Sequence, residues 1–206
     1  MSTNQKLKVV VIGASGTIGK DVAKALQEKG HEVIRVSRSS GDYTVDMQSK
    51  QSLENLFRQI GSFDAVASAA GEIGSAPASL KNLTDDNFAF ALSHKLMGQI
   101  NIVRTALPYI ADGGSFTLVS GVLTNEPIFG GTIGTVVNSG VEGFVKAQAH
   151  DLPRSIRINC ISPNVLEEST AYHPFFPGSI PVETWKVTRA YERSILGVIN
   201  GRILSV

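Results

Sequence analysis

The sequence predicts an α/β protein, a doubly wound parallel sheet of seven strands in a single domain. Three observations predict it. Short apolar segments alternate with amphipathic segments along the whole chain, as in repeated βαβ units. Small or polar residues follow the apolar segments, at the edge of a parallel sheet where ligands bind. The first apolar segment runs directly into three regularly spaced glycines.

The composition is that of a globular protein, and it argues against several functional classes. A chain of 206 residues with 42% apolar residues can bury a substantial core. The net charge is +1 and the charges are mixed, so we expect no nucleic-acid partner and no anionic membrane surface. Cys160 is the only cysteine, so we expect no intrachain disulfide and no metal site. Without a signal-like N-terminus or a membrane-length apolar segment, we expect a cytoplasmic protein.

Residues 7–19 read LKVVVIGASGTIG, which predicts a strand, a glycine turn and the start of a helix. Gly13 allows a positive φ, Gly16 lets the backbone approach a pyrophosphate, and Gly19 permits close packing of the helix on the strand. The free N–H groups of the helix N-terminus then attract phosphate. The spacing G-x-x-G-x-x-G thus predicts a dinucleotide phosphate site, and a glycine turn without function is the alternative.

The other elements follow from apolar periodicity and from capping residues. The expected helices span residues 20–29, 49–60 (begun by Ser49 or Ser52), 84–110, 135–152 and 182–196. The expected strands span residues 9–12, 31–36, 43–45, 63–67, 115–119, 156–161 and 202–206. Gly30 is expected to end the first helix, Thr84 to begin the third, and Gly113-Gly114 to break the chain before the fifth strand. Within the single domain, residues 1–110 are expected to form the cofactor half and residues 111–206 the substrate half, with 164–180 as a loop or lid.

The end of the second strand favours one nicotinamide cofactor over the other. A carboxylate at this place favours NAD, whereas an arginine offers its planar fork of donors to the 2′-phosphate of NADP. Here Ser37-Arg38-Ser39 ends the strand, with no acid before Asp42. Arg38 therefore predicts NADP(H) rather than NAD(H), and a solvated surface arginine is the alternative. Asp46, after the third strand, can accept from the adenine amino group or simply stabilise a turn.

Several segments, in the right order, resemble the short-chain dehydrogenase/reductase family over nearly the whole chain. They are GASGTIG at 13–19, AAG at 69–71 where the family has NAG, Leu107-Pro108, VEGFVKAQAHDL at 141–152 and RINCISPNV at 157–165. The resemblance implies a Rossmann-type sheet and reversible hydride transfer between NAD(P) and an alcohol or carbonyl. It also implies a homodimer or homotetramer, which a monomer at micromolar concentration would contradict.

The strand ends and the resemblance together define an expected cofactor site. It comprises Gly13, Ser15, Gly16, Thr17, Ile18, Gly19, Ser37, Arg38, Ser39, Asp46, Met47, Ala69, Ala70, Gly71, Lys95, Pro163 and Val165.

The chain departs from the family at the catalytic residues. The family uses a tyrosine as general acid, a lysine four residues later, a serine that orients the carbonyl, and a helix asparagine that positions a water. Here the tyrosine position holds Gly134, the lysine position Asn138, the serine position Gly121 and the asparagine position Lys95. No Y-x-x-x-K follows from any of the four tyrosines, which are Tyr43, Tyr109, Tyr172 and Tyr191.

Two functional hypotheses follow. In the first, the chain is a divergent reductase of a small carbonyl or alcohol, in which Lys95 donates the proton and Ser120 polarises the carbonyl. Tyr172 and His173, from the loop 164–180, are the other candidate acids. In the second hypothesis, the chain binds NADP(H) as a sensor or interaction module without turnover. The alternative for Lys95 is to hold the cofactor or extend into solvent, and the alternative for Ser120 is simply to end a strand. A module that binds no nucleotide is a third class.

Overall fold

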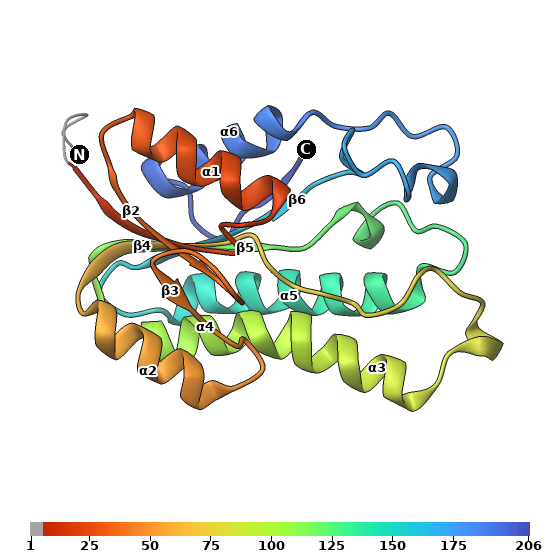
Figure 1. The fold of residues 1–206 in the computed structure, drawn as a ribbon, viewed down its shortest axis with the longest axis horizontal. Coiled ribbons are helices and arrows are strands. Elements are labelled where there is room, and N and C mark those ends of the chain that lie inside the picture. Colours follow the sequence, from red (N-terminus) through yellow and green to blue (C-terminus); the bar gives the residue numbers. More distant parts are fainter. Residues whose placement is uncertain (1–5) are drawn as a thin grey trace.

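Seven parallel strands form one sheet in the computed structural model, which describes residues 6–206 (Figure 1). The strand order is β3-β2-β1-β4-β5-β6-β7, so the chain starts in the middle of the sheet and winds outward in both directions. The strands are β1 (Lys8–Ile12), β2 (Glu32–Ser37), β3 (Tyr43–Thr44), β4 (Phe63–Ser68), β5 (Ile110–Val119), β6 (Arg157–Ser162) and β7 (Ile203–Ser205). The winding direction changes between β1 and β4, where open α/β sheets bind ligands.

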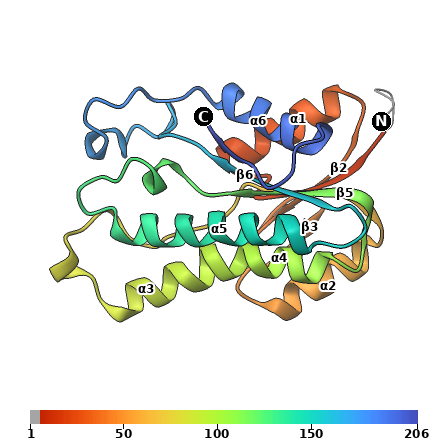
Figure 2. The same ribbon diagram turned by 180° about the vertical axis from the view of Figure 1, so that it is seen from behind.

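Helices cover both faces of the sheet, with α1 and α6 on one face and α2, α4 and α5 on the other (Figures 1 and 2). The α-helices are α1 (Thr17–Glu28), α2 (Lys50–Ile60), α3 (Asp85–Ala91), α4 (Gly98–Ala106), α5 (Thr132–Asp151) and α6 (Thr184–Leu196). A π-helical segment, Leu92–Met97, joins α3 to α4. Short 3₁₀ helices span Leu80–Asn82, Val122–Thr124 and His173–Phe175. None of these helices, within residues 6–206, is long and apolar enough to cross a lipid bilayer.

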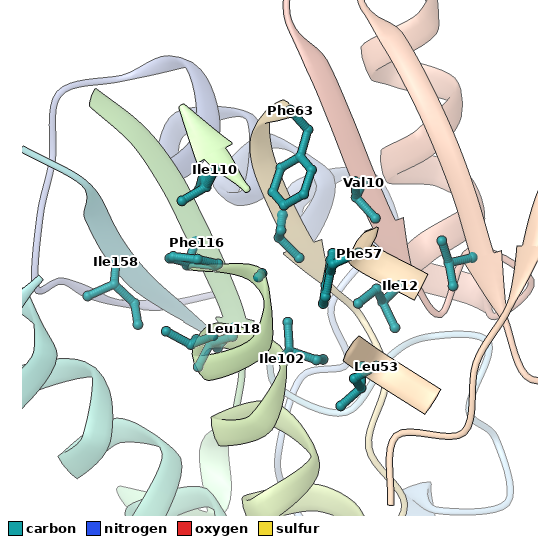
Figure 3. Packing of buried hydrophobic residues seen from close by; sticks show 14 of the residues in the cluster. Val10, Ile12, Leu53, Phe57, Phe63, Ile102, Ile110, Phe116, Leu118 and Ile158 are labelled. Carbon is teal, nitrogen blue, oxygen red and sulfur yellow. The ribbon is translucent and has the colours of Figure 1, made fainter. Parts of the chain in front are cut away.

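The two faces of the sheet bury separate cores. Val9 and Val11 of β1 belong to the cluster under α1 and α6, whereas Val10 and Ile12 belong to the cluster under α2, α4 and α5. Figure 3 shows Val10 and Ile12 with Phe57 and other side chains of the second cluster. Because both faces are covered, β1 is a continuous apolar segment rather than an alternating one.

The predicted long helix over residues 84–110 is wrong at its C-terminal end. The chain leaves α4 at Ala106, and β5 already begins at Ile110 rather than at Ser115. Pro108 accounts for the early stop, because it has no backbone N–H with which to continue the helical hydrogen bonds, although Leu107 before it still has helical φ and ψ. The predicted chain break at Gly113-Gly114 is also wrong, since both glycines lie inside β5. There Gly113 has a φ of +72°, and the pairing of β4 with β5 shifts register.

Three predicted helix starts are displaced by two or three residues. α1 and α5 begin three residues before the predicted positions, because an apolar stripe does not mark the first turn of a helix. α6 begins at Thr184 rather than at 182, because Val182 pairs with Leu166 in an isolated parallel bridge. The predicted helix caps are confirmed at three places. The side chains of Ser49 and Thr84 cap α2 and α3, and Gly30 follows α1 with a φ of +85°.

Candidate functional site

The glycine turn after β1 has the close contacts that its spacing predicts. Gly13 has a φ of +86°, and a Cβ there would lie 2.7 Å from the carbonyl oxygen of Ala69 at the end of β4. A Cβ on Gly19 would collide with the Gly13 carbonyl oxygen. Gly16 caps α1, so the first amides of the helix, including those of Thr17 and Ile18, have no acceptor within the helix. The turn therefore presents unpaired N–H groups and a positive helix end to an anion.

A cleft of about 410 Å³ lies in front of this turn. Eleven of the predicted cofactor residues line it: Gly13, Ser15, Gly16, Ser37, Arg38, Ser39, Asp46, Met47, Ala69, Ala70 and Gly71. Sequence reasoning missed Ile12, Val45, Gln48, Glu72 and His94, which also line it. Thr17, Ile18 and Gly19 lie in the first turn of α1. Lys95, Pro163 and Val165 line a second cavity instead.

Arg38 lies at the mouth of this first cleft, on a turn that Ser37 stabilises. The buried Ser37 hydroxyl bonds to the backbone of Ser40, accepting from its N–H at 3.0 Å. The exposed Arg38 guanidinium reaches across to Glu72 and forms an ion pair of 3.0 Å between Nη2 and Oε2. This pair joins the end of β2 to the segment after β4. The Arg38 guanidinium is accessible from solvent, and an anionic ligand that binds it would compete with the Glu72 carboxylate.

Asp46 forms the turn before α2. Its Oδ1 accepts from the N–H of Gln48 at 3.0 Å, and its own N–H donates to the Ser52 hydroxyl at 3.1 Å. The residue is exposed and lines the cleft, so one carboxylate oxygen stabilises the turn while the side chain still faces the ligand space.

The second cavity, which we call the inner cavity, has a volume of about 240 Å³. It lies at the carboxyl ends of β5 and β6, between α5 and the loop after β6. The two predicted catalytic residues come together at it: the ammonium of Lys95 donates to the backbone carbonyl of Ser120 at 3.1 Å. Most of the other lining residues are apolar, Leu123 and Phe176 among them, so the few polar groups face a largely apolar space.

Lys95 owes its position to the π-helical segment. Its neighbour His94 lines the first cleft, whereas Lys95 lines the inner cavity, so this segment separates the two spaces. The lysine stem packs against Gly71, where a Cβ would lie 2.9 Å from Lys95 Cγ. Burial lowers the pKa of the Lys95 ammonium from 10.5 to about 8. Burial also raises the pKa of the Cys160 thiol to about 12, so the thiol is protonated at neutral pH.

The hydroxyl of Ser120 is directed toward α5. It donates to Oε1 of the buried Glu142 at 2.8 Å, while the backbone N–H of Ser120 donates to Ile161 at 2.8 Å. To donate to a substrate carbonyl, Ser120 would have to give up its bond to Glu142. In the observed arrangement its backbone carbonyl positions the Lys95 ammonium.

Gly134 and Asn138, which stand at the tyrosine and lysine positions of the family pattern, also line the inner cavity. A Cβ on Gly134 would lie 2.8 Å from Leu123 Cδ1, so Leu123 occupies the space next to this glycine. Asn138 is buried; its amide donates to the Gly121 carbonyl at 3.3 Å, and its Oδ1 has no hydrogen-bond partner. An unpartnered buried oxygen is unfavourable unless a ligand or water donates to it.

Only one of the other two candidate acids reaches the inner cavity. Tyr172 is half exposed and lines it. His173 does not line it, and its Nε2 lies 2.9 Å from the Leu166 carbonyl oxygen. The structure therefore brings Tyr172, Lys95 and Ser120 to one cavity and leaves His173 within its own loop.

A family model described as enoyl-(acyl carrier protein) reductase matches residues 5–176, more than half of the chain. The chain belongs to the short-chain dehydrogenase/reductase family. Among curated proteins of this family, carbonyl reductase family member 4 from Xenopus laevis is 26% identical, over 76% of this chain and 74% of that protein. Carbonyl reductase [NADPH] 2 from Sus scrofa is 26% identical, over 78% of this chain and 72% of that protein.

Solved structures agree with this assignment. Protein lin1944 from Listeria innocua is 42% identical and superposes with a TM-score of 0.93, over 97% of this chain and 99% of that one. A small-chain dehydrogenase in complex with NADPH is 26% identical, with a TM-score of 0.86 over 98% of this chain and 97% of that one. The predicted family and the predicted Rossmann-type sheet are thus confirmed, and the chain is similar to known oxidoreductases along its length.

Proposed function

We propose that this chain is an NADP(H)-dependent oxidoreductase that interconverts a small carbonyl compound and its alcohol, with Lys95 as the proton donor. The observation that carries the proposal is the position of the Lys95 ammonium. It lies in an apolar cavity beside the first cleft, with a pKa of about 8. A lysine with a lowered pKa is suited to proton transfer at neutral pH.

The first cleft fits a dinucleotide phosphate. A Cβ at Gly13 or Gly19 would fill the space that lets the backbone come close, and the N-terminal amides of α1 are free to bind phosphate oxygens. Arg38 supports NADP(H), because a guanidinium at the end of β2 can bind a 2′-phosphate. The relatives agree: one is named an NADPH carbonyl reductase, and a 26% identical neighbour was solved with NADPH. When bound, the cofactor supplies or accepts the hydride at the carbonyl carbon.

The residues of the inner cavity supply the rest of the chemistry. Lys95 gives its proton to the substrate oxygen as the alcohol forms, and it takes a proton back in the reverse direction. The Ser120 carbonyl holds the ammonium in place. The free Oδ1 of Asn138 can accept from the alcohol hydroxyl, which satisfies that buried oxygen.

Turnover across a panel of aldehydes, ketones and quinones tests this proposal through NADPH oxidation. We expect Lys95→Met to lower kcat/KM by about 10²- to 10⁴-fold, the usual contribution of a general acid. The matched control is Lys146→Met, because Lys146 is an exposed lysine of α5. Reduction requires the protonated lysine, so the wild-type rate should be constant below pH 8 and decline above it. Undiminished turnover in Lys95→Met would exclude the assignment.

A second function, NADP(H) binding without turnover, is favoured by two observations. The Ser120 hydroxyl already donates to Glu142, and Gly134 offers no side chain in place of the family tyrosine. A redox sensor or interaction module would keep the first cleft and need no proton donor. It predicts tight NADPH binding with no oxidation of NADPH by any member of the panel.

We also propose a homodimer or homotetramer, by resemblance to the family. Met97 of the π-helical segment and Val136 of α5 are exposed apolar side chains on the helical segments that would pair. Light scattering at micromolar concentration tests this, and a monomeric mass would contradict it.

A further inference from the structure

A separate hollow of about 510 Å³, which we call the outer groove, lies next to the inner cavity. Residues 126–129 of the loop after β5 form one side, and residues 174–179 of the loop after β6 form the other. Ile128 and Phe176 line both spaces, so these two side chains lie between them. The loops that follow β4, β5 and β6 project together at one end of the molecule (Figures 1 and 2).

The lining of the outer groove is apolar and aromatic. Phe129 is 86% exposed and Phe175 is 37% exposed, although both are large apolar side chains. Exposed apolar side chains that cluster in one place mark a binding surface. Glu126 is the one ionisable residue among those that line the groove. The groove therefore suits an uncharged apolar group, and its single carboxylate repels an anionic one.

The loop after β6, which forms one side of this groove, is held in place by its own backbone and side-chain hydrogen bonds. Leu166 and Val182 pair across its base, and the N–H of Val182 donates to the Val165 carbonyl at 2.8 Å. The side-chain amide of Asn164 donates to the Ser179 hydroxyl at 2.8 Å, which holds the C-terminal end of the loop 164–180 against its N-terminal end. Because this side of the groove is already held in place, a ligand that binds against it pays little ordering cost there.

We propose that the outer groove binds the apolar tail of the substrate, so that the preferred substrates are uncharged medium-chain aliphatic aldehydes and their alcohols. The inference rests on the proposed function, in which the reacting carbonyl lies beside Lys95. The inner cavity, at about 240 Å³, is smaller than the range of roughly 300–1,000 Å³ that is usual for ligand sites. It accommodates the reacting end, and the tail passes Ile128 and Phe176 into the outer groove.

A series of unbranched aldehydes from butanal to octanal tests the tail site. Each methylene that enters an apolar groove should raise kcat/KM about two- to four-fold, so octanal should exceed butanal by at least about tenfold. An aldehyde of similar length that ends in a carboxylate should not share this rise, because Glu126 repels it. Equal kcat/KM across the series, or an equal rise with the carboxylate-ended aldehyde, would overturn the proposal.

Two matched variants locate the effect. Phe129→Ser removes one side of the groove and leaves the tail exposed to solvent. The octanal-to-butanal ratio of kcat/KM should then fall toward one. Ile180→Ser is the control, because Ile180 is an equally exposed apolar residue (84%) of the loop 164–180 and lines neither space. If both variants lower the ratio equally, the groove is not the tail site. If Phe129→Ser instead dissociates an oligomer in light scattering, this face is a contact between copies and the proposal fails.

A binding measurement separates this proposal from the proposed function. Calorimetric titration with 1-octanol and 1-butanol needs no turnover. If no aldehyde is reduced but octanol binds at least about tenfold tighter than butanol, and Phe129→Ser removes the difference, then the reductase assignment fails and the tail site stands. If aldehydes are reduced but neither rate nor affinity depends on chain length, the reductase assignment stands and the tail site is overturned.

Discussion

Lys95 destabilises the folded state at neutral pH, because its ammonium is partly buried. Its pKa is about 8 in the folded chain, against 10.5 for an exposed lysine. Below pH 8 both states carry the proton, and the folded state bears the full desolvation penalty. Between pH 8 and 10.5 the unfolded state binds more protons, so this contribution to stability rises with pH.

Replacement of Lys95 by methionine should therefore stabilise the protein while it lowers kcat/KM. We expect a gain of roughly 1–3 kcal/mol at pH 7, which shrinks as the pH rises from 8 toward 10.5. Urea denaturation at pH 7 and pH 9.5 measures both values. Lys146→Met, at an exposed site of α5, should show neither change. An unchanged midpoint for Lys95→Met at pH 7 would show that the lysine is better solvated than its surroundings indicate.

The Arg38–Glu72 pair makes a prediction about cofactor preference. Both side chains are exposed, so the pair itself contributes less than about 1 kcal/mol to stability. Glu72 nevertheless competes with a 2′-phosphate for the guanidinium. Glu72→Gln should tighten NADPH binding several-fold, whereas NADH binding, which involves no 2′-phosphate, should change little.

Arg38→Ala should act in the opposite direction and weaken NADPH binding by about 10- to 100-fold, the loss of a charge-assisted hydrogen bond. Arg35→Ala is the matched control, because Arg35 lies on β2 three residues before Arg38 and bonds to Gln27 of α1. Fluorescence titration with NADPH and NADH gives the six affinities of the wild type and the two variants. An unchanged NADPH-to-NADH ratio in Arg38→Ala would remove Arg38 from the cofactor site.

Residues at strand ends could be placed from the sequence, and residues on irregular segments could not. Gly13 and Arg38 line the first cleft as predicted, because a parallel sheet brings the carboxyl ends of its strands to one edge. Glu72 lies in a loop without apolar periodicity, so the sequence pattern does not indicate that it lines the first cleft. His94 lies in the π-helical segment, whose wider turn shifts side chains off the faces that a 3.6-residue period predicts.

At the scale of elements, α1 and α5 offer a matched pair of helical glycines. A Cβ on Gly19 would collide with the Gly13 carbonyl, whereas a Cβ on the exposed Gly143 would meet nothing within 4 Å. Gly143→Ala should therefore stabilise the protein by about 0.5–1 kcal/mol through helix propensity.

Gly19→Ala should do the reverse, because the backbone of the turn has to move away from α1. It should lower the unfolding free energy by about 1–3 kcal/mol, in the range of an overpacked site, and weaken cofactor binding. Thermal denaturation of both variants, with and without NADPH, separates the two effects. If Gly19→Ala behaved like Gly143→Ala, close helix packing would not be the role of this glycine.

The predicted elements failed where tertiary contacts override local signals. Gly113 and Gly114 read as a chain break, yet the Gly113 N–H donates to the Arg154 carbonyl at 2.8 Å and the strand continues. Val182 reads as part of a helix, yet it pairs with the start of the same loop. Both partners are distant in sequence, so periodicity could not reveal them.

At the scale of the whole molecule, the seven-stranded sheet followed from the alternation of elements, but the shape of the substrate side did not. The outer groove depends on two loops whose shared residues, Ile128 and Phe176, are far apart in sequence. Only the fold brings these two loops together at the cavity that Lys95 lines.

Cofactor binding by the whole domain should appear as thermal stabilisation. A ligand that binds only the folded state adds about 2.7 kcal/mol when its concentration is 100 times Kd. For a chain of this length, 1 kcal/mol corresponds to about 2–4 °C in Tm, so NADPH at that concentration should raise Tm by about 5–11 °C. NADH at the same concentration should raise it less, because it lacks the phosphate that Arg38 would bind.

The same measurement separates the three functional classes when it is combined with turnover. A shift with NADPH together with turnover that Lys95→Met abolishes supports the reductase. A shift without turnover on any substrate supports the sensor, in which the cleft remains and the proton donor is unused. No shift with either cofactor would mean that the glycine turn serves only to pack α1 against β1 and β4. In that case Arg38→Ala would leave Tm unchanged in the presence of NADPH, since no phosphate would reach the guanidinium.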